Sequence, residues 1–446
     1  MKKLSTIVLL IIGLLLVSQV VSAAEANWGS IDWMQFKGTQ LNVLATSMPV
    51  AEVYKSKIAE FEKLTGIKVN FELLNDVDRR KKQLVDYASG MGEYDVGNVG
   101  FSNREEFAQP GYLEPLQPYL DDSKLTDKTW YNLDDYPKDV LAAGTSGDKL
   151  VMIPFTAEYF LLWYNKDIFT QLGLTPPKTS ADLKDVAAKL DQARKDGKIE
   201  QYAFIDRTMS GASEGGWNLF CTAHRMGFDF VDFKNMVSNA NTPKGIEIMR
   251  YYTDLCKQYG PPGSANWTWT DIGAAFTQGK LAMAVGGNAS YAYLEDKTNS
   301  KVAGKVGYVP PPMENGKDPL WIWGWAINAK SKNKEASWLL VQWLTSPNLI
   351  AEMAPLYGCP ARKSVYSLPE YIKAMPSQEF INSQLWMMEN GIDPYTQFVL
   401  TPKYGEVADL VSKEMNAVMA GIKTTEQACQ DADAALVKIG FKSSTP

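Results

Sequence analysis

The segment Gly211-Ala212-Ser213-Glu214-Gly215 matches the pattern in which a serine between two glycines serves as a nucleophile. That chemistry needs a strand directly before the serine and a histidine that accepts its proton. The preceding apolar stretch ends near Ile205, and the chain's one histidine, His224, lies a short way downstream on a predicted helix. The pattern therefore indicates a glycine-serine loop rather than a catalytic triad.

Other catalytic patterns are missing from the sequence. It contains no HExxH, no calcium-binding loop of the EF-hand type and no phosphate-cradling loop, so we expect no metal and no cofactor. A glycoside hydrolase would need only two carboxylates, and 51 acidic residues make some pair unavoidable. A secreted glycoside hydrolase is therefore the alternative hypothesis from a different class of protein.

The charge and the first residues bear on location and partners. A formal net charge of −6 argues against binding nucleic acid through phosphate contacts. Two early lysines, an apolar run at 7–17 and small residues at 22–24 are typical of a secretory signal peptide. The run is shorter than the about 20 residues that span a bilayer. We expect residues 1–24 to be cleaved. Because no cysteine follows the run, we expect a periplasmic protein without a lipid anchor.

The first part of the chain alternates strand and helix patterns. Strands are expected at 41–45, 67–73 and 94–99, with a helix before Gly66 and another near 79–87. This order predicts a parallel sheet covered by helices. Ligands bind beyond the carboxyl ends of such strands, where the polar loops 46–48, 75–76 and 100–103 are expected.

A second unit of the same kind is expected further along. The pattern predicts strands at 150–155, 160–164, 202–205, 281–285 and 321–327, and helices that include one capped by Ser180 and one at 243–258. A chain of 446 residues exceeds the size at which one hydrophobic core keeps growing. The sequence therefore predicts two domains.

Four sequence blocks carry a resemblance to a known family. They are GYLEPL at 111–116; PFTAE at 154–158 with YNKDIF at 164–169 and GLTPP at 173–177; FTQGKLAM at 276–283; and SKNKEASW at 331–338 with Trp343-Leu344. In this order and spacing the chain resembles the extracellular solute-binding proteins of bacterial carbohydrate ABC importers. The segments at 259–263, 321–323 and 362–366 are most similar to the sugar and polyol binders. The Trp-rich lead at Trp28 and Trp33 has no counterpart.

The resemblance implies an α/β fold of two lobes, each a parallel-rich sheet flanked by helices. The implied segments are 25–152 plus 326–356 for the N-terminal lobe, 156–322 plus 360–440 for the C-terminal lobe, and hinges near 153–156, 323–326 and 357–362. It also implies a monomer that is not an enzyme. The protein would close on a sugar or polyol between its lobes and deliver it to an ABC permease in the inner membrane. A glycerol phosphate diester is the alternative ligand, since two arginines are among the candidates below.

Four tryptophans are candidate ligand contacts, because a sugar offers apolar C–H faces that pack on flat aromatic rings. Trp321 and Trp323 project from one face of a strand that leads into an expected hinge. Trp217 and Trp269 fall where similar proteins place aromatic residues near the sugar. The alternative for each tryptophan is a place in the core.

Polar candidates complete the expected site. Glu158 could accept hydrogen bonds from two hydroxyls, and Arg207 and Arg362 could donate to neighbouring hydroxyls, with structural ion pairs as the alternative. Further candidates at strand and hinge ends are Asn75, Asp76, Phe101, Ser102, Thr156 and Asn288, several of which could equally be helix caps. Similar polyol binders often carry a carboxylate where this chain has Asn288.

Of the four cysteines, Cys221 and Cys256 fall in the same expected lobe. If a structural disulfide forms in an oxidising compartment, we expect it between these two. Buried free thiols are the alternative, and the spacing matches no metal-binding pattern.

Overall fold

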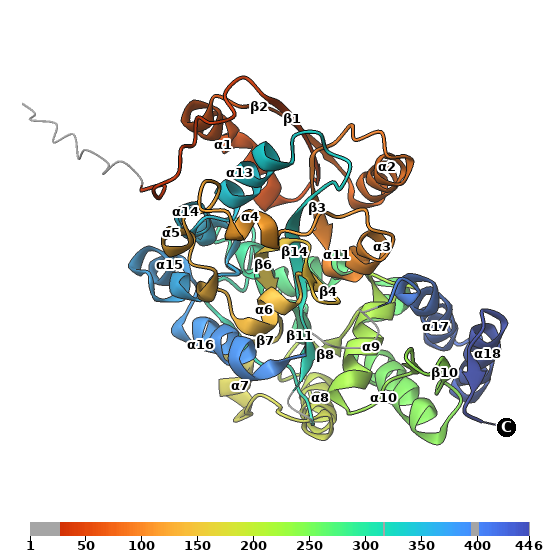
Figure 1. Cartoon of the computed structure of the whole chain (residues 1–446). Helices are drawn as coiled ribbons and strands as arrows, with labels where there is room; N and C mark the ends of the chain where they lie inside the picture. The colour runs from red at the N-terminus through yellow and green to blue at the C-terminus, as the bar shows by residue number, and fades with distance from the viewer. Residues whose placement is uncertain (1–26, 315–316, 394–400, 446) are drawn as a thin grey trace, which may run out of the picture.

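A computed structural model describes residues 27–314, 317–393 and 401–445, so the expected signal peptide lies outside the described residues. Figure 1 shows two groups of elements, one around strands β1 to β3 and the other around β7, β8 and β11. Within these ranges we find no helix that has both the length and the apolar character needed to cross a membrane.

The first lobe is built on a five-stranded sheet. Its order is β2 (Lys68–Leu74), β1 (Gln40–Thr46), β3 (Val96–Gly100), β14 (Trp321–Ile327) and β6 (Ile153–Glu158). β1 pairs in parallel with β2 and β3, through crossover helices α1 (Pro49–Thr65) and α2 (Asp76–Ser89), as the alternating pattern predicts. β14 runs antiparallel to both of its neighbours. α1 ends at Gly66, whose φ of 68° suits a residue without a Cβ.

The second sheet has the order β12 (Val306–Val309), β7 (Phe160–Asn165), β11 (Leu281–Gly287) and β8 (Tyr202–Ile205). β7 runs antiparallel to both β12 and β11, and only β11 and β8 are parallel. The expectation of a parallel-rich sheet is therefore wrong for this lobe. Only Tyr159 separates β6 from β7, so β7 enters the sheet at the hinge, where β11 ends, and Phe160 pairs with Gly287.

Helices cover the second sheet and extend this lobe. They include α8 (Ser180–Lys195), α9 (Gly215–Arg225), α10 (Pro243–Tyr259), α17 (Tyr404–Met419) and α18 (Thr425–Lys438). In Figure 1, α17 and α18 lie beside α9 and α10, although some 150 residues separate them in sequence, and contacts between these helices agree. The cap of α8 is Thr179, not Ser180: the Thr179 hydroxyl accepts from the Asp182 N–H, and the Asp182 carboxylate accepts from the Thr179 N–H.

The remaining elements connect these layers. Further helices are α3 (Arg104–Ala108), α4 (Gln117–Asp121), α5 (Lys128–Tyr131), α6 (Lys138–Ala142), α7 (Lys166–Leu172), α11 (Trp269–Thr277), α12 (Tyr291–Leu294), α13 (Lys334–Leu344), α14 (Pro347–Tyr357), α15 (Pro369–Ala374) and α16 (Gln378–Trp386). Short strands are β4 (Thr145–Ser146) with β5 (Lys149–Leu150), β9 (Val231–Asp232) and β16 (Lys442–Ser443) with β10 (Val237–Ser238), and β13 (Asp318–Pro319) with β15 (Ile392–Asp393).

The Trp-rich lead packs on the first lobe. Trp28 and Trp33 lie 6.2 Å apart between ring centroids, and each contacts Trp130 edge-on, at 6.2 and 5.8 Å. Trp28 also lies 6.3 Å from Trp343 of α13, whose indole is fully buried. Rings in such geometries bury a large apolar area. The lead therefore packs against the outer side of helix α13.

The chain crosses between the sheets close to the expected hinges. β6 stays in the first sheet until Glu158, and β14 already belongs to that sheet at Trp321. Ala157 N–H donates to the Cys359 carbonyl at 2.9 Å, which fixes the third crossing segment beside β6. The first sheet thus reaches to Glu158 and begins again at Trp321, a few residues beyond the expected bounds of the first lobe at two of the crossings. The full division into lobes stays a prediction.

Candidate functional site

Glu158 is an acidic side chain at the point where the first sheet ends. It is the last residue of β6 and lies opposite Trp321 of β14. Among the residues that the structure describes, its carboxylate has neither a hydrogen bond nor an ion pair within 4 Å. Burial raises the pKa of Glu158 to about 7, and the nearby charge of Arg207 opposes that rise. A partly buried carboxylate without a partner is suited to accept hydrogen bonds from a ligand.

Arg207 supplies donors to the same region. It follows β8, and its guanidinium lies 5.6 Å from the centroid of the Phe160 ring. One N–H donates to the Ser213 carbonyl at 2.9 Å, and no other hydrogen bond of this guanidinium is made to a described residue. The positive charge of Arg207 lowers the pKa of both Glu158 and Glu214, although burial raises each of them overall. Arg207 thus places free donors between two carboxylates.

Three tryptophans form an aromatic row across the lobes. Trp217 of α9 contacts Trp321 edge-on, with 4.8 Å between ring centroids, and Trp321 lies 6.4 Å from Trp323. Trp321 is partly exposed, whereas Trp217 and Trp323 are buried. The row therefore joins a strand of the first sheet to a helix of the second lobe, and Trp321 offers the accessible indole surface.

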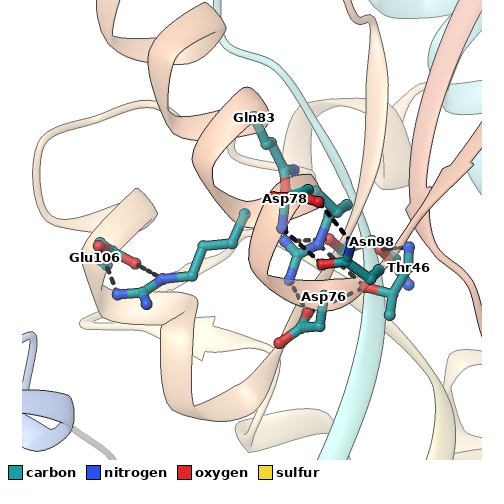
Figure 2. Close-up of polar contacts among 9 residues, drawn as sticks. Thr46, Asp76, Asp78, Gln83, Asn98 and Glu106 are labelled. Carbon is teal, nitrogen blue, oxygen red and sulfur yellow. Dashed lines mark hydrogen bonds and ion pairs between the residues drawn. The ribbon is translucent and has the colours of Figure 1, made fainter.

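Arg79 supports the first-lobe end of the aromatic row. Its buried guanidinium lies 5.8 Å from the Trp323 ring centroid and donates to Asp76 Oδ1 and Gln83 Oε1, both at 2.6 Å. It also donates at 3.1 Å to Oγ1 of Thr46, the last residue of β1. Figure 2 shows the labelled Asp76, Gln83 and Thr46 grouped together, with Glu106 apart from them. Asp76, 46% exposed, is therefore an ion-pair partner whose second oxygen is left to solvent.

Asn75 and Trp269 lie outside this group. Asn75 is the N-cap of α2, accepting from the Asp78 N–H at 3.0 Å, which is the alternative that its loop position left open. Trp269 is 48% exposed at the start of α11, and its backbone N–H donates to Glu214 Oε2 at 3.3 Å. Trp269 therefore contacts Glu214 at the rim of the site and does not belong to the aromatic row.

Arg362 is a structural residue. Its guanidinium is fully buried in the first lobe and donates to the carbonyls of Tyr131, Asn132 and Thr345 at 2.9 to 3.0 Å. It also lies 3.6 Å from Asp135. These contacts favour the structural alternative for Arg362, because its donors are used by backbone carbonyls, and its expected ligand contact stays a prediction.

Asn288 is also occupied by the protein itself. It is fully buried, its Oδ1 accepts from the Tyr159 N–H at 3.3 Å, and its amide donates to the Gln384 side chain at 2.5 Å. These bonds fasten the end of β11 to the crossing between β6 and β7. These contacts favour a structural role for Asn288, and its expected ligand contact stays a prediction.

Two of the remaining candidates, Thr156 and Phe101, lie in packed surroundings, whereas the side chain of Ser102 lies outside what the structure describes. The Thr156 hydroxyl accepts from the Trp323 N–H at 3.1 Å and is buried, so it holds β6 to β14. Phe101 is fully buried, with the Arg104 guanidinium 5.0 Å from its ring centroid, which favours a place in the core; its ligand contact stays a prediction. Ser102 lies in the same short turn, 101–103.

The expected disulfide is not formed. Cys221 on α9 and Cys256 on α10 are buried free thiols, as are Cys359 and Cys429. Burial raises the pKa of the Cys221 and Cys256 thiols, which disfavours the thiolate that disulfide formation requires. Free buried thiols, the alternative, are what the structure contains.

Three residues of this region were not expected from the sequence: Glu214, Phe160 and Arg79. Glu214 stands in the segment that matches a nucleophile motif, where only the serine was weighed as a functional residue. Arg79 is expected at the start of a helix, but the helix begins at Asp76, which brings Asp76 and Arg79 three residues apart on one helix. Phe160 gave no signal, because its strand reads as buried throughout.

The two sheets, the crossings between them and the aromatic row define a two-lobed binding protein of the periplasmic type. The sequence pattern of bacterial extracellular solute-binding proteins matches residues 45–348, more than half of the chain. The chain belongs to this family.

Three similar proteins bind polyols, as their names state. An erythritol/L-threitol-binding protein of Mycolicibacterium smegmatis is 27% identical over 77% of this chain and 75% of its own. A mannitol-binding protein of Pseudomonas aeruginosa is 27% identical over 84% of this chain and 86% of its own. A solute-binding protein of Agrobacterium radiobacter in complex with ribitol has a TM-score of 0.79 and 26% identity, covering 90% of this chain and 99% of its own.

Proposed function

We propose that this chain captures a small polyol or monosaccharide at the site formed by Glu158, Arg207 and the aromatic row, and delivers it to an ABC permease. The observation that carries the proposal is the Glu158 carboxylate, which has no hydrogen bond or ion pair to any described residue and lies near the charge of Arg207, whose guanidinium makes one hydrogen bond to the described part of the chain. A hydroxyl both donates and accepts, so vicinal hydroxyls can bridge such a pair. The exposed face of Trp321 suits the C–H groups of the same molecule.

The charge balance of the site favours a neutral ligand. Glu158 and Glu214 flank Arg207, while Arg362 is buried against backbone carbonyls elsewhere. An anionic glycerol phosphate diester would meet two carboxylates and one available arginine, so its binding would be opposed by like charge. Polyol binding in the relatives agrees with this preference.

Closure of the lobes completes the proposal. Trp321 belongs to the first sheet and Trp217 to a helix of the second lobe, so a ligand at Trp321 contacts both lobes at once. A ligand that binds the closed arrangement better than the open one shifts the population toward closure. The closed form would dock on the permease as a monomer, without chemical change to its cargo.

The test is a ligand screen with two matched variants. Thermal unfolding is followed with erythritol, ribitol, D-mannitol, maltose and glycerophosphoglycerol. A ligand at 100 times its Kd stabilises the folded state by about 2.7 kcal/mol. We expect polyols or monosaccharides to raise the Tm of the wild type and of Glu200→Gln, a change at an exposed glutamate, but much less in Glu158→Gln. Stabilisation by the phosphodiester alone would overturn the proposal.

Catalysis and export are tested on the same protein. Chromatography after incubation with oligosaccharides should show no new reducing ends, because we propose binding without hydrolysis; new reducing ends would support the hydrolase. Cell fractionation and N-terminal sequencing should find the protein in the periplasm without its first 24 residues or a lipid. Recovery with the membrane would contradict that location.

A further inference from the structure

The backbone of Arg207 is held from both sides by buried side chains. Its N–H donates to Asp206 Oδ1 at 2.8 Å, and its carbonyl accepts from the Tyr252 hydroxyl at 2.6 Å. Asp206 and Tyr252 are 3% and 2% exposed, so neither can contact a ligand directly. Both backbone polar groups of Arg207 are thus fixed from within the second lobe.

Asp206 also connects Arg207 to the helix that carries Trp217. The same Oδ1 accepts from the side-chain amide of Asn218, which follows Trp217 on α9. The charge of Arg225, at the other end of α9, favours the ionised form of Asp206, although burial raises its pKa overall. One buried carboxylate therefore links the strand end that bears Arg207 to the helix that bears Trp217.

We infer that Asp206 and Tyr252 are positioning residues for ligand binding, which hold Arg207 in the orientation that the ligand requires. The inference rests on the proposed function. Preorganised donors bind more tightly because the entropy of ordering them is lost on folding rather than on binding. A freed Arg207 backbone would let the guanidinium turn toward Glu158 or Glu214, both of which feel its charge. Ligand affinity would then fall although no ligand contact has been removed.

Helix α10 supplies a matched control. Tyr251, the residue before Tyr252, donates its hydroxyl to the Ser180 carbonyl at 3.0 Å, and both tyrosines line the same internal cavity. Tyr251→Phe and Tyr252→Phe therefore each remove one tyrosine-to-carbonyl hydrogen bond from one helix. Only Tyr252 bonds to Arg207.

The experiment measures Kd by calorimetry for the polyol of the panel that binds wild type most tightly. One hydrogen bond predicts that Tyr252→Phe weakens binding by about two- to tenfold, with Tyr251→Phe unchanged. In an Arg207→Ala background, Tyr252→Phe should have no further effect on Kd, because the residue it positions is gone. A merely structural role would lower Tm equally in both backgrounds without this coupling. Asp206→Asn is the second variant and should couple to Arg207→Ala in the same way.

The outcomes separate the two proposals. If wild type binds a polyol and Tyr252→Phe and Asp206→Asn leave Kd unchanged, or weaken it equally with and without Arg207, the inference is overturned and the proposed function stands. If wild type binds no polyol or sugar of the panel, the proposed function falls, and the positioning role falls with it.

Discussion

Replacing Glu158 by glutamine should make the free protein more stable and the complex weaker. A carboxyl group whose pKa rises on folding, from 4.5 to about 7, binds its proton more tightly in the folded state than in the unfolded state. As the pH rises from 4.5 to 7 the unfolded chain releases this proton first. The free energy of unfolding therefore falls by about 3 kcal/mol over that interval, and the loss is complete above pH 7.

Glutamine does not ionise, so the variant should not lose this stability. We expect Glu158→Gln to exceed wild type in the free energy of unfolding at pH 8 and to match it at pH 4, measured by urea unfolding without ligand. The exposed Glu200→Gln should behave as wild type at both pH values. Curves for wild type and Glu158→Gln that run parallel from pH 4 to 8 would refute the reasoning, because the carboxylate would then not be buried without a partner.

Binding should change in the opposite direction. A hydrogen bond to a charged acceptor contributes about 1.5 to 3 kcal/mol, so the loss of the Glu158 charge should raise Kd by about tenfold to a hundredfold at pH 8. In wild type the affinity should also fall as the pH drops below 7, since protonation removes the negative charge of the acceptor. Calorimetry across this range should show a flat profile for the variant. An equal pH dependence in both proteins would assign the titration to another group.

Three further results are expected. Trp321→Ala should weaken polyol binding by about tenfold, within the range of an aromatic contact, while a circular-dichroism melt shows a folded protein; unchanged Kd would exclude Trp321 from the site. Arg362→Met should lower the free energy of unfolding in urea by about 3 to 5 kcal/mol, because Asp135 stays buried without its partner. Kd should stay unchanged, and a raised Kd would return Arg362 to the site. A thiol reagent should modify Cys221 and Cys256 only after unfolding, and a reductant should not shift Tm; a Tm lowered by the reductant would indicate a disulfide.

The strands were predictable because their residues alternate or run apolar between turn residues. The strand at 202–205 falls exactly where it is expected in β8, and the expected 41–45 and 67–73 differ from β1 and β2 by one residue at each end. The antiparallel placement of β7 was not predictable. It follows from a single-residue crossing at Tyr159, and sequence patterns do not reveal which sheet a strand joins.

The kinds of side chain at the candidate site were predictable from the sequence, but which residues supply them was less so. Glu158, Arg207, Trp217 and Trp321 do come together. Arg362 has the same chemical character as Arg207, but its acceptors lie some 230 residues away in the chain, at Tyr131 and Asn132. Such long-range partners decide whether an arginine faces a ligand or a carbonyl, and no local pattern shows them.

The edge-on contact of Trp217 and Trp321 has an optical consequence. Two indoles whose centroids lie 4.8 Å apart, on elements of different lobes, have coupled electronic transitions whose strength depends steeply on distance and angle. Any rotation of one lobe against the other alters that coupling, and with it the near-ultraviolet spectrum and the fluorescence of the unlabelled chain. These two optical signals of the unlabelled chain thus report on the angle between its lobes.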